Sequence, residues 1–397
     1  DICHAYQIFK KNGVPDSNII VFMYDDIANN AQNPQKGVII NTDNGPNVYP
    51  GVPKDYTGDD VTPENFLNVL MGKDMSGIGS GKTLKSGPKD RVFIFFSDHG
   101  APGLVAFPGF KMLYAKDLIP VLTNMSNQNK FDQLVFYLEA CESGSMFNKI
   151  LSPKLRIYAT TASNPFESSY ACDYNSGAGA YLNDCYSFNY MNDTDFANLQ
   201  KETLQQQFVN IKKTTTQSHV CAYGDLSIQS QPIGNYLSNS FKIAPKVSTN
   251  AAVPKKNFKK GVSSRDVKEI YLLKKIETSS TFEKPVWMAE YKEYKREQNR
   301  VDTVFGAFSN ALNLHRIREQ REALLADNAD DHCTSQAAID MDCMKDSVIA
   351  YETECGRFNE YSIRYVAHIR DACEMNVAPA TQQAQFSKIC STINREI

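Results

Sequence analysis

The sequence predicts an α/β protein whose mainly parallel sheet is covered by helices on both faces, followed by an all-α C-terminal region. Two apolar runs, 91–96 and 133–138, are rich in aromatic and β-branched residues and stop abruptly, as buried strands do. Strand-like and helix-like segments alternate up to about residue 225, the order typical of parallel strands with helical crossovers. Half of the ten cysteines lie at or after Cys333, within segments of helical pattern.

The N-terminal elements are read from spacing and punctuation. Apolar residues at helical spacing open the chain, namely Ile2, Ala5, Tyr6 and Phe9. Gly13 is expected to end this helix. A strand is expected over 19–24, followed by a loop rich in Gly, Pro and Asn at about 29–61. Thr62 as N-cap with Pro63 behind it predicts a short helix.

The remaining elements follow in the same way. They are a helix near 114–130, a strand over 156–160, a polar-faced helix over 196–214 and a last strand over 219–223. From about residue 225 the pattern changes, and residues 225–262, with their prolines and lysines, predict a linker. Helical charge patterning over 284–300 and a helical apolar period over 301–325 predict further helices.

Composition is that of an ordinary globular protein, with 397 residues, 42% hydrophobic and 22% charged residues. The net charge of −3 argues against nucleic acid as a general partner. No segment reaches the roughly 20 apolar residues of a membrane span, so no membrane partner is expected. The charge is unevenly distributed: residues 1–245 carry −4, 246–300 carry +7 and 301–397 carry −6.

The cysteines indicate disulfides in an oxidising compartment. They stand at positions 3, 141, 172, 185, 221, 333, 343, 355, 373 and 390. No close Cys-x-x-Cys pair suggests zinc, and no metal or cofactor is expected. Asn124 and Asn192 begin glycosylation sequons, a pattern that fits a secretory route and also arises by chance.

His99 and Cys141 each stand directly after a predicted buried strand. Sites in open α/β sheets are built at the carboxyl ends of strands, and a thiol and an imidazole there make a nucleophile and an acid/base. A single residue of either kind is more often structural. The pair, 42 positions apart, is spaced much as in caspases.

Several motifs in one order strengthen this reading. They are His99-Gly100, the run Glu-Ala-Cys-Glu-Ser-Gly-Ser at 139–145, and the segments 3–7, 24–28, 51–58, 77–82, 158–162 and 167–172. Together they resemble the legumain family of asparaginyl endopeptidases, from Asp1 to about Gly224. The resemblance implies a caspase-like fold with a cysteine peptidase domain at 1–225, a linker and activation peptide at 226–300, and a helical, disulfide-bonded pro-domain at 301–397.

The resemblance also implies the roles of the catalytic residues. Cys141 would be the nucleophile, and His99 the acid and base, since imidazole exchanges a proton near neutral pH. Gly100 has no side chain to obstruct its N–H, which with that of Cys141 would form the oxyanion hole. Asp98 matches a family residue that can cyclise to a succinimide and accompanies a peptide-ligating side activity; a solvated strand-end carboxylate is an equally good explanation.

Specificity for asparagine, with weaker cleavage after aspartate, would rest on a polar pocket. By resemblance Glu139 and Asp184 accept from the substrate amide, and Ser168 and Ser169 line the pocket. Where the family commonly has Trp after the matching Asp, this chain has Cys185, which changes one wall.

The family has a strand before its first helix, and the following loop supplies an Asn, an Arg and a His to the site. The chain opens within that helix, so these residues cannot be assigned, and a chain without the strand is expected to aggregate. The other histidines show no partner in sequence and are taken as structural. They are His4, His219, His315, His332 and His368.

The pro-domain is expected to inhibit its own enzyme. By resemblance Cys343 pairs with Cys373 and Cys355 with Cys390, which leaves Cys333 unpaired. Because a basic segment joins two acidic regions, we expect its Lys and Arg side chains to dock on carboxylates of the cleft at neutral pH and to leave them in acid. Glu139 and Asp184 are expected among these carboxylates. The expected self-cleavage sites are Asn239, Asn250 and Asn257.

The function predicted is therefore an asparagine-directed cysteine endopeptidase of the secretory pathway, lysosome or vacuole, or secreted. Its partners would be proteins and peptides with an accessible asparagine, its own pro-domain and inhibitors of the cystatin type. Two alternatives stay open. A lipid-anchor transamidase shares the His-Gly and Cys motifs, and an inactive truncated product would only bind or inhibit.

Overall fold

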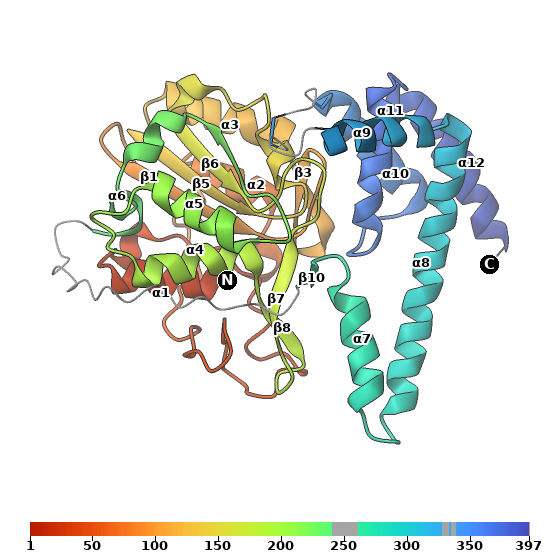
Figure 1. Cartoon of the computed structure of the whole chain (residues 1–397), viewed down its shortest axis with the longest axis horizontal. Coiled ribbons are helices and arrows are strands. Elements are labelled where there is room, and N and C mark those ends of the chain that lie inside the picture. The colour runs from red at the N-terminus through yellow and green to blue at the C-terminus, as the bar shows by residue number, and fades with distance from the viewer. Residues whose placement is uncertain (240–260, 328–332, 335–338, 397) are drawn as a thin grey trace.

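The central sheet has the strand order β1-β5-β6-β9 (Figure 1). The computed structural model describes residues 1–239, 261–327, 333–334 and 339–396. The strands of this sheet are β1 Arg91–Ser97, β5 Gln133–Glu139, β6 Ile157–Thr161 and β9 Cys221–Gly224. β1, β5 and β6 are parallel and β9 is antiparallel to β6, so the predicted mainly parallel sheet is confirmed.

Helices cover both faces of the sheet. The helices are α1 Ile2–Lys11, α2 Pro63–Leu70, α3 Ala115–Asn127, α4 Cys185–Phe196, α5 Leu204–Thr214 and the short α6 Gly234–Leu237. Successive side chains of β5 point to opposite faces. Leu134 and Phe136 pack in one core with α2 and α3, whereas Val135 and Tyr137 pack in another with α1, α4 and α5. Burial on both faces explains why β5 is a continuous apolar run.

Two small antiparallel sheets flank the central one. One has the order β2-β3-β4, with β2 Gly100–Ala101, β3 Leu104–Phe107 and β4 Lys111–Tyr114. The other has the order β10-β7-β8, with β7 Tyr170–Asn175, β8 Ala180–Asp184 and β10 Val262–Ser263. β10 comes from the predicted linker, so the linker adds an antiparallel strand to the edge of β7.

The rest of the chain, residues 267–396, is a helical region beside the sheet domain (Figure 1). Its helices are α7 Val267–Thr278, α8 Lys284–Leu312, α9 His315–Asp327, α10 Met341–Cys355, α11 Val366–Glu374 and α12 Pro379–Glu396. Its core, built around Phe305 and Phe386, continues into Leu104 and Ala106 of β3, so the two parts share one packed interface. The expected domain boundary at residue 300 falls inside α8.

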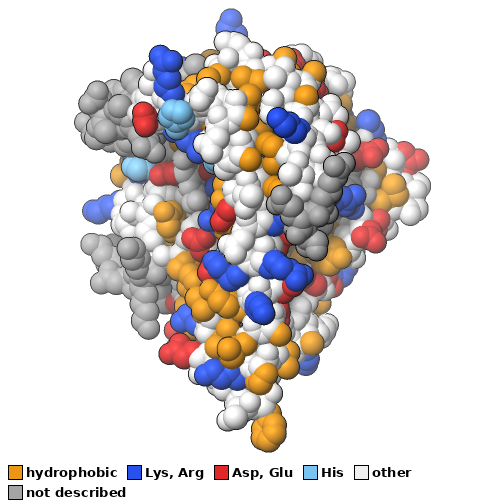
Figure 2. Space-filling model, turned by 90° about the vertical axis from the view of Figure 1, so that its right-hand side faces the viewer, with side chains coloured by type: hydrophobic (Ala, Val, Ile, Leu, Met, Phe, Trp, Pro, Cys, Tyr) orange, Lys and Arg blue, Asp and Glu red, His pale blue; other side chains and the backbone are white. Residues whose placement is uncertain are grey.

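Figure 2 looks onto the helical region from outside. Hydrophobic and basic side chains gather over the lower part of this face, where α7 and α8 lie. Large apolar side chains exposed there include Phe282, Val286 and Met288. None of the helices in the described residues is both long enough and apolar enough to span a bilayer.

Eight of the ten cysteines form disulfides. Cys343 is bonded to Cys373 and Cys355 to Cys390, the pairing implied by resemblance, and both bridges lie within the helical region. Cys172 is bonded to Cys185. The expectation that Cys333 is unpaired was wrong, because Cys333 is bonded to Cys221, 112 residues earlier in the chain.

The strand expected over 19–24 is not formed. The segment is extended, and its hydrogen bonds run to Tyr56, whose N–H donates to the Val21 carbonyl and whose carbonyl accepts from Met23. Only an isolated bridge joins Phe22 to Tyr56. A cavity of about 1640 Å³ separates the segment from β1, so it has no ladder partner on that side. The apolar pattern reflected burial rather than sheet pairing.

The helix expected over 196–214 begins later than predicted, at Leu204, and ends at Thr214 as expected. α4 ends at Phe196, and α5 begins after Thr203, whose side chain accepts from the Gln206 N–H at 3.2 Å while its own N–H donates to Gln206 Oε1 at 2.9 Å. This capping box satisfies two backbone donors and starts a new helix. α1, α2 and α3 agree with their predicted positions.

The capping box makes a testable contribution to stability. Thr203→Ala should lower the free energy of unfolding by about 1 kcal/mol, because the Gln206 N–H loses its acceptor. Thr203→Ser keeps a hydroxyl and is the matched control. Chemical denaturation of both variants in a Cys141→Ala background measures the difference, and equal stabilities would contradict the role of the cap.

Candidate functional site

His99 and Cys141 lie at neighbouring ends of two parallel strands. Every residue of β1 pairs with one of β5, and the last pair is Ser97 opposite Glu139. The Asp98 N–H then donates to the Glu139 carbonyl oxygen at 3.2 Å. His99 and Cys141 each come two residues after the last pair, so the register brings them to the same edge of the sheet.

The thiol of Cys141 is buried, with 1% of the residue exposed. The Ser169 N–H donates to Sγ at 3.3 Å, and the Ser169 hydroxyl lies 3.7 Å from Sγ. Burial raises the pKa of the Cys141 thiol, although the nearby Arg265 acts in the opposite direction. Because the thiolate is the reactive form, the thiol is unreactive in this closed arrangement.

The His99 imidazole stacks on Phe110, with 5.7 Å between ring centroids. Its Nδ1 is buried without a hydrogen-bond partner, and no hydrogen bond joins it to Cys141 within the described residues. Such contacts often tighten only when substrate binds. Gly100 lies directly against Cys141, since a Cβ on Gly100 would sit 2.3 Å from the Cys141 carbonyl oxygen. Only glycine fits there.

Two pocket carboxyl groups, Glu139 and Asp184, are close enough to influence each other. Oε2 of Glu139 accepts from the N–H and the hydroxyl of Ser187, each at 2.9 Å, whereas the buried Oε1 has no partner in the described part of the chain. Burial and then the charge of Asp184 raise the pKa of Glu139 to about 8. Burial likewise raises the pKa of Asp184. Glu139 is therefore largely protonated at neutral pH.

The β7–β8 hairpin delivers Asp184 to the pocket. Asp184 pairs with Ala171 across the hairpin, and the Ser97 hydroxyl donates to Asp184 Oδ2 at 3.5 Å. Ser168 and the buried Ser169 immediately precede β7. Cys185, expected to change one wall, is bonded to Cys172 and so ties α4 to β7, a constraint that sequence reading missed.

Asp98 lies between the two strand ends and is half-buried. Its Oδ1 accepts from the His99 N–H at 2.6 Å. Burial raises the pKa of Asp98 to about 6, against the influence of His99.

The linker crosses the site as an extra strand. In β10, Val262 pairs antiparallel with Ala171 and Ser263 with Tyr170. The Ser264 N–H donates to the Ser169 carbonyl oxygen at 3.0 Å, and the two hydroxyls lie 3.3 Å apart. Since Ser169 also contacts the Cys141 thiol, the linker occupies the approach to the nucleophile.

Arg265 follows Ser264 and is buried, with 6% of the residue exposed. Its Nη1 donates to Glu142 Oε1 at 3.1 Å, Nη2 forms an ion pair with Glu142 Oε2, and Nη2 also donates to the Gly100 carbonyl oxygen at 2.8 Å. Burial raises the pKa of Glu142, with Arg265 acting in the opposite direction. One guanidinium thus neutralises the residue after the nucleophile and contacts the backbone of Gly100.

A linker cation docks in the cleft as expected, but the expected carboxylates were wrong. Among the described residues, no Lys or Arg of the linker pairs with Glu139 or Asp184. The register of β10 on Tyr170 places Arg265 at the turn of Glu142 instead. The sequence alone did not identify this pair. Arg265 is one of many basic residues in the linker, and nothing near Glu142 in sequence indicates which residue it contacts.

The helical region holds the linker in place. The Arg364 guanidinium donates to the Arg265 carbonyl oxygen at 3.1 Å and pairs with Asp266 at 2.8 Å. Across the interface, Lys345 pairs with Asp117 of α3 at 2.8 Å.

Asp371 organises three arginines at the same interface. It pairs with Arg318 at 2.8 Å, Arg321 at 2.8 Å and Arg370 at 3.0 Å. Arg321 and Arg370 lie over the Phe166 ring of the sheet domain, 5.8 and 5.1 Å from its centroid. Burial opposes ionisation of Asp371, but Arg370 and Arg321 hold its pKa below the ordinary value.

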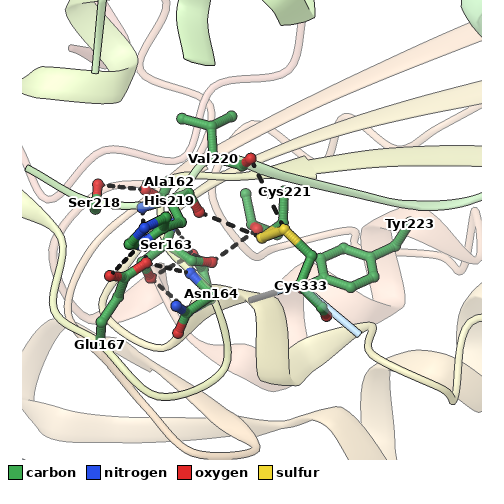
Figure 3. Close-up of a disulfide and its surroundings, with 12 residues drawn as sticks. Ala162, Ser163, Asn164, Glu167, Ser218, His219, Val220, Cys221, Tyr223 and Cys333 are labelled. Carbon is green, nitrogen blue, oxygen red and sulfur yellow. Dashed lines mark hydrogen bonds and ion pairs between the residues drawn. A yellow bond between two sulfur atoms is a disulfide. The ribbon is translucent and has the colours of Figure 1, made fainter. Parts of the chain in front are cut away.

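Glu167 is hydrogen-bonded to His219 and Asn164 (Figure 3), and its backbone contacts the residue after the nucleophile. Its carboxylate accepts from the His219 N–H at 2.7 Å and pairs with His219 Nδ1 at 2.8 Å, and it also accepts from the Asn164 N–H at 2.9 Å. Its carbonyl accepts from the Glu142 N–H at 2.7 Å. His219 therefore has a partner 52 residues away, which no local pattern could reveal.

The two sequons lie on helices. Asn124 is exposed on α3, and Asn192 is half-buried on α4, where the sequon residue Thr194 is fully buried. Glycosylation at both positions stays a prediction.

Comparison with known proteins adds to this geometry. The model of the Peptidase C13 family matches residues 1–240, and the model described as Legumain, prodomain matches residues 292–390. Legumain of Rattus norvegicus is 39% identical over 398 residues, which cover 98% of this chain and 88% of that protein. Legumain of Bos taurus is 53% identical over 235 residues, 59% of this chain and 54% of that protein. The Vacuolar-processing enzyme delta-isozyme of Arabidopsis thaliana is 37% identical over 410 residues, 98% of this chain and 86% of that protein.

The raised pKa of Glu139 gives a pH-dependent stability with a defined sign. A carboxyl group whose pKa is about 8 in the fold and about 4.5 when unfolded stabilises fully below pH 4.5, and this contribution is lost as pH rises towards 8. A tenfold difference in proton affinity between the folded and unfolded chain corresponds to about 1.4 kcal/mol. Glu139→Gln cannot ionise, so its stability relative to the parent should increase by a few kcal/mol between pH 5 and 9.

Thermal unfolding of Cys141→Ala and of Cys141→Ala/Glu139→Gln across this pH range measures the difference. The exposed Glu293→Gln is the matched control and should give no pH-dependent difference. A constant difference between the Glu139 variant and its parent would show that Glu139 is ionised throughout.

Proposed function

Because the chain belongs to the peptidase C13 family, it is a cysteine endopeptidase with a prodomain, and we propose that it cleaves peptide bonds after asparagine and, more weakly, after aspartate. We further propose residues 1–225 as the catalytic domain, 226–300 as linker and activation peptide, and 301–397 as the prodomain. The observation that carries the proposal is the register of β1 and β5, which ends with Ser97 opposite Glu139 two residues before His99 and Cys141.

The catalytic steps follow from these side chains. The Cys141 thiolate attacks the carbonyl carbon of the scissile bond, and the N–H groups of Gly100 and Cys141 stabilise the oxyanion. His99 protonates the departing amine, which leaves an acyl group on Cys141. Water activated by His99 then hydrolyses the thioester and restores the thiol.

Asparagine recognition uses the two pocket carboxyl groups in different protonation states. A protonated Glu139 can donate to the side-chain carbonyl of asparagine, and Asp184 can accept from its NH₂ group. Ser168 and Ser169 complete the pocket. An aspartate side chain matches this pattern only when it is protonated, which accounts for weaker cleavage after aspartate.

Peptide ligation is a further part of the proposal. An amine that reaches the acyl group on Cys141 before water forms a new peptide bond. Asp98 supports this activity, because the backbone nitrogen of His99, which would close the succinimide ring, lies 2.6 Å from Asp98 Oδ1. Burial also favours the protonated carboxyl group, the form that cyclises. Substrates would be proteins and peptides with accessible asparagine, with cystatin-type inhibitors as a second class of partner.

Acid is proposed to release the prodomain. The ion pair of Arg265 with Glu142 exists only in the closed form, because Arg265 leaves with the linker. Protonation of Glu142 in acid removes this attraction, so we expect the closed form to lose stability as pH falls. Such a response suits an acidic lysosomal or vacuolar compartment.

Among the alternatives, the match to a prodomain model and the disulfide-bonded helical region favour the endopeptidase over a lipid-anchor transamidase. His99 and Cys141 are both present, which argues against an inactive protein.

The catalytic assignment predicts the effect of two substitutions. Cys141→Ala should abolish cleavage of asparagine-containing peptides, and His99→Ala should lower kcat/KM by several orders of magnitude, because nucleophile and acid/base act in one unit. His315→Ala, which lies outside the site, is the control. Retained cleavage by Cys141→Ala would refute the assignment.

The acid-release proposal predicts the behaviour of Arg265→Gln. Leaving Glu142 buried without a cation costs about 3–5 kcal/mol, so the closed form should open at a higher pH than in the parent. The rate of Cys141 alkylation, read by peptide mass, reports opening at each pH. The control is Arg296→Gln, which removes an exposed cation of α8.

New C-termini formed on acidification provide a second readout. Processing should be fastest in acid and should fall between 225 and 300. Asn239 lies within the described residues, whereas Asn250 and Asn257 lie outside them. Processing that is fastest at neutral pH would contradict acid release.

A further inference from the structure

One disulfide joins the two functional parts of the chain. Cys221, the first residue of β9, is bonded to Cys333, which lies between α9 and α10. The other three disulfides each stay within one part, and the two remaining cysteines, Cys3 and Cys141, are free. All ten cysteines lie in the described residues, so Cys221–Cys333 is the single covalent link between catalytic domain and prodomain other than the backbone.

The bridge lies next to Tyr223, and the Cys333 Sγ is also close to the Val220 carbonyl oxygen (Figure 3). Cys221 is fully buried in the sheet, whereas Cys333 is partly exposed. The Tyr223 hydroxyl donates to the Cys333 carbonyl oxygen at 3.1 Å. The same hydroxyl abuts Gly144, where a Cβ would lie 2.5 Å from it, in the turn that follows Cys141.

A cut in the linker does not break this link. A cut between Asn239 and Gly261 leaves β10 and Arg265 on the prodomain fragment, and Cys221 on the catalytic fragment. The two fragments stay joined by Cys221–Cys333, and a tethered inhibitor rebinds at the high effective concentration of an intramolecular partner. Such tethering strengthens apparent binding by about 10²–10⁴-fold.

We propose that Cys221–Cys333 is a redox latch that keeps the cut protein inhibited until a thiol reductant opens it. Release then needs two covalent events, hydrolysis of the linker and reduction of the disulfide. This inference rests on the proposed inhibition by β10 and Arg265, and it adds a reductant of the dithiol class as a regulator.

The reduction balances as ordinary thiol–disulfide exchange. A dithiol thiolate attacks Sγ of Cys333, the more accessible sulfur, and Cys221 leaves as a thiolate that takes a proton. The second thiol of the reductant resolves the mixed disulfide and frees the Cys333 thiol. The dithiol is oxidised to a disulfide by two electrons, and both cysteines are reduced.

The test uses the full-length chain with a recognition sequence for a specific endopeptidase placed in residues 240–260. Purified without reductant and cut, it should run as one species on a denaturing gel and as two after dithiothreitol. In acid, at sub-micromolar concentration, both fragments should co-elute from a sizing column, whereas a sample first reduced with dithiothreitol at neutral pH should separate. Cys221→Ser/Cys333→Ser should separate without reductant, whereas Cys355→Ser/Cys390→Ser, which lacks only a bridge inside the prodomain, should stay linked.

Activity gives a separate readout. The cut, oxidised parent should cleave an asparagine peptide about 100-fold more slowly than the cut Cys221→Ser/Cys333→Ser variant. Dithiothreitol should remove the difference, and its effect on the variant alone reports any re-reduction of Cys141. If no sample cleaves the peptide while the gel and column results hold, the substrate proposal fails and the covalent latch stands.

Three results would overturn the latch: separation of the cut parent without reductant, equal and measurable activity of the cut parent and the double variant, or absence of a Cys221–Cys333 peptide. Peptide mapping of the unreduced parent tests directly for the Cys221–Cys333 peptide, and this measurement does not depend on the folding of any variant.

Discussion

The site depends on the pairing of β1 with β5. Seven residue pairs fix their register, and a slip by one residue would turn every side chain of a strand to the opposite face. Because both strands are buried on both faces, such a slip would disrupt two cores at once. The register therefore determines that His99 and Cys141 end at one edge, and that Glu139 and Glu142 lie on either side of the nucleophile.

Burying several carboxyl groups at that edge creates an electrostatic cost, which the closed form meets in two ways. Glu142 is neutralised by a guanidinium from the linker, so its compensation is lost when the linker leaves. Burial and the charge of Asp184 raise the pKa of Glu139 to about 8, so Glu139 is neutralised by a proton that stays with the catalytic domain. The first arrangement couples inhibition to the linker, whereas the second prepares a hydrogen-bond donor for a neutral substrate side chain.

Local patterns predicted the strands that carry His99 and Cys141 and the capped helix after Thr62, whereas the disulfides within the helical region were predicted from the resemblance to a known family. Local patterns failed where a partner lies far away in sequence. The segment 19–24 has a strand's composition but lies across a cavity from β1, and the pairs Arg265–Glu142 and Cys221–Cys333 join residues more than 100 positions apart. Composition predicted that a linker cation would dock in the cleft, but only the register of β10 could identify the carboxylate that receives it.

The contacts that close the site differ in what breaks them. Protons weaken the ion pair of Glu142 with Arg265, but they leave the backbone ladder of β10 and the disulfide intact. Hydrolysis of the linker removes neither of these, because β10 stays on the tethered fragment. Acid and hydrolysis each lower the affinity of the prodomain without removing it from the site. The weakened prodomain therefore leaves the site only when the Cys221–Cys333 bond is also broken. Hydrolysis of the linker and the onset of activity are thus separate events.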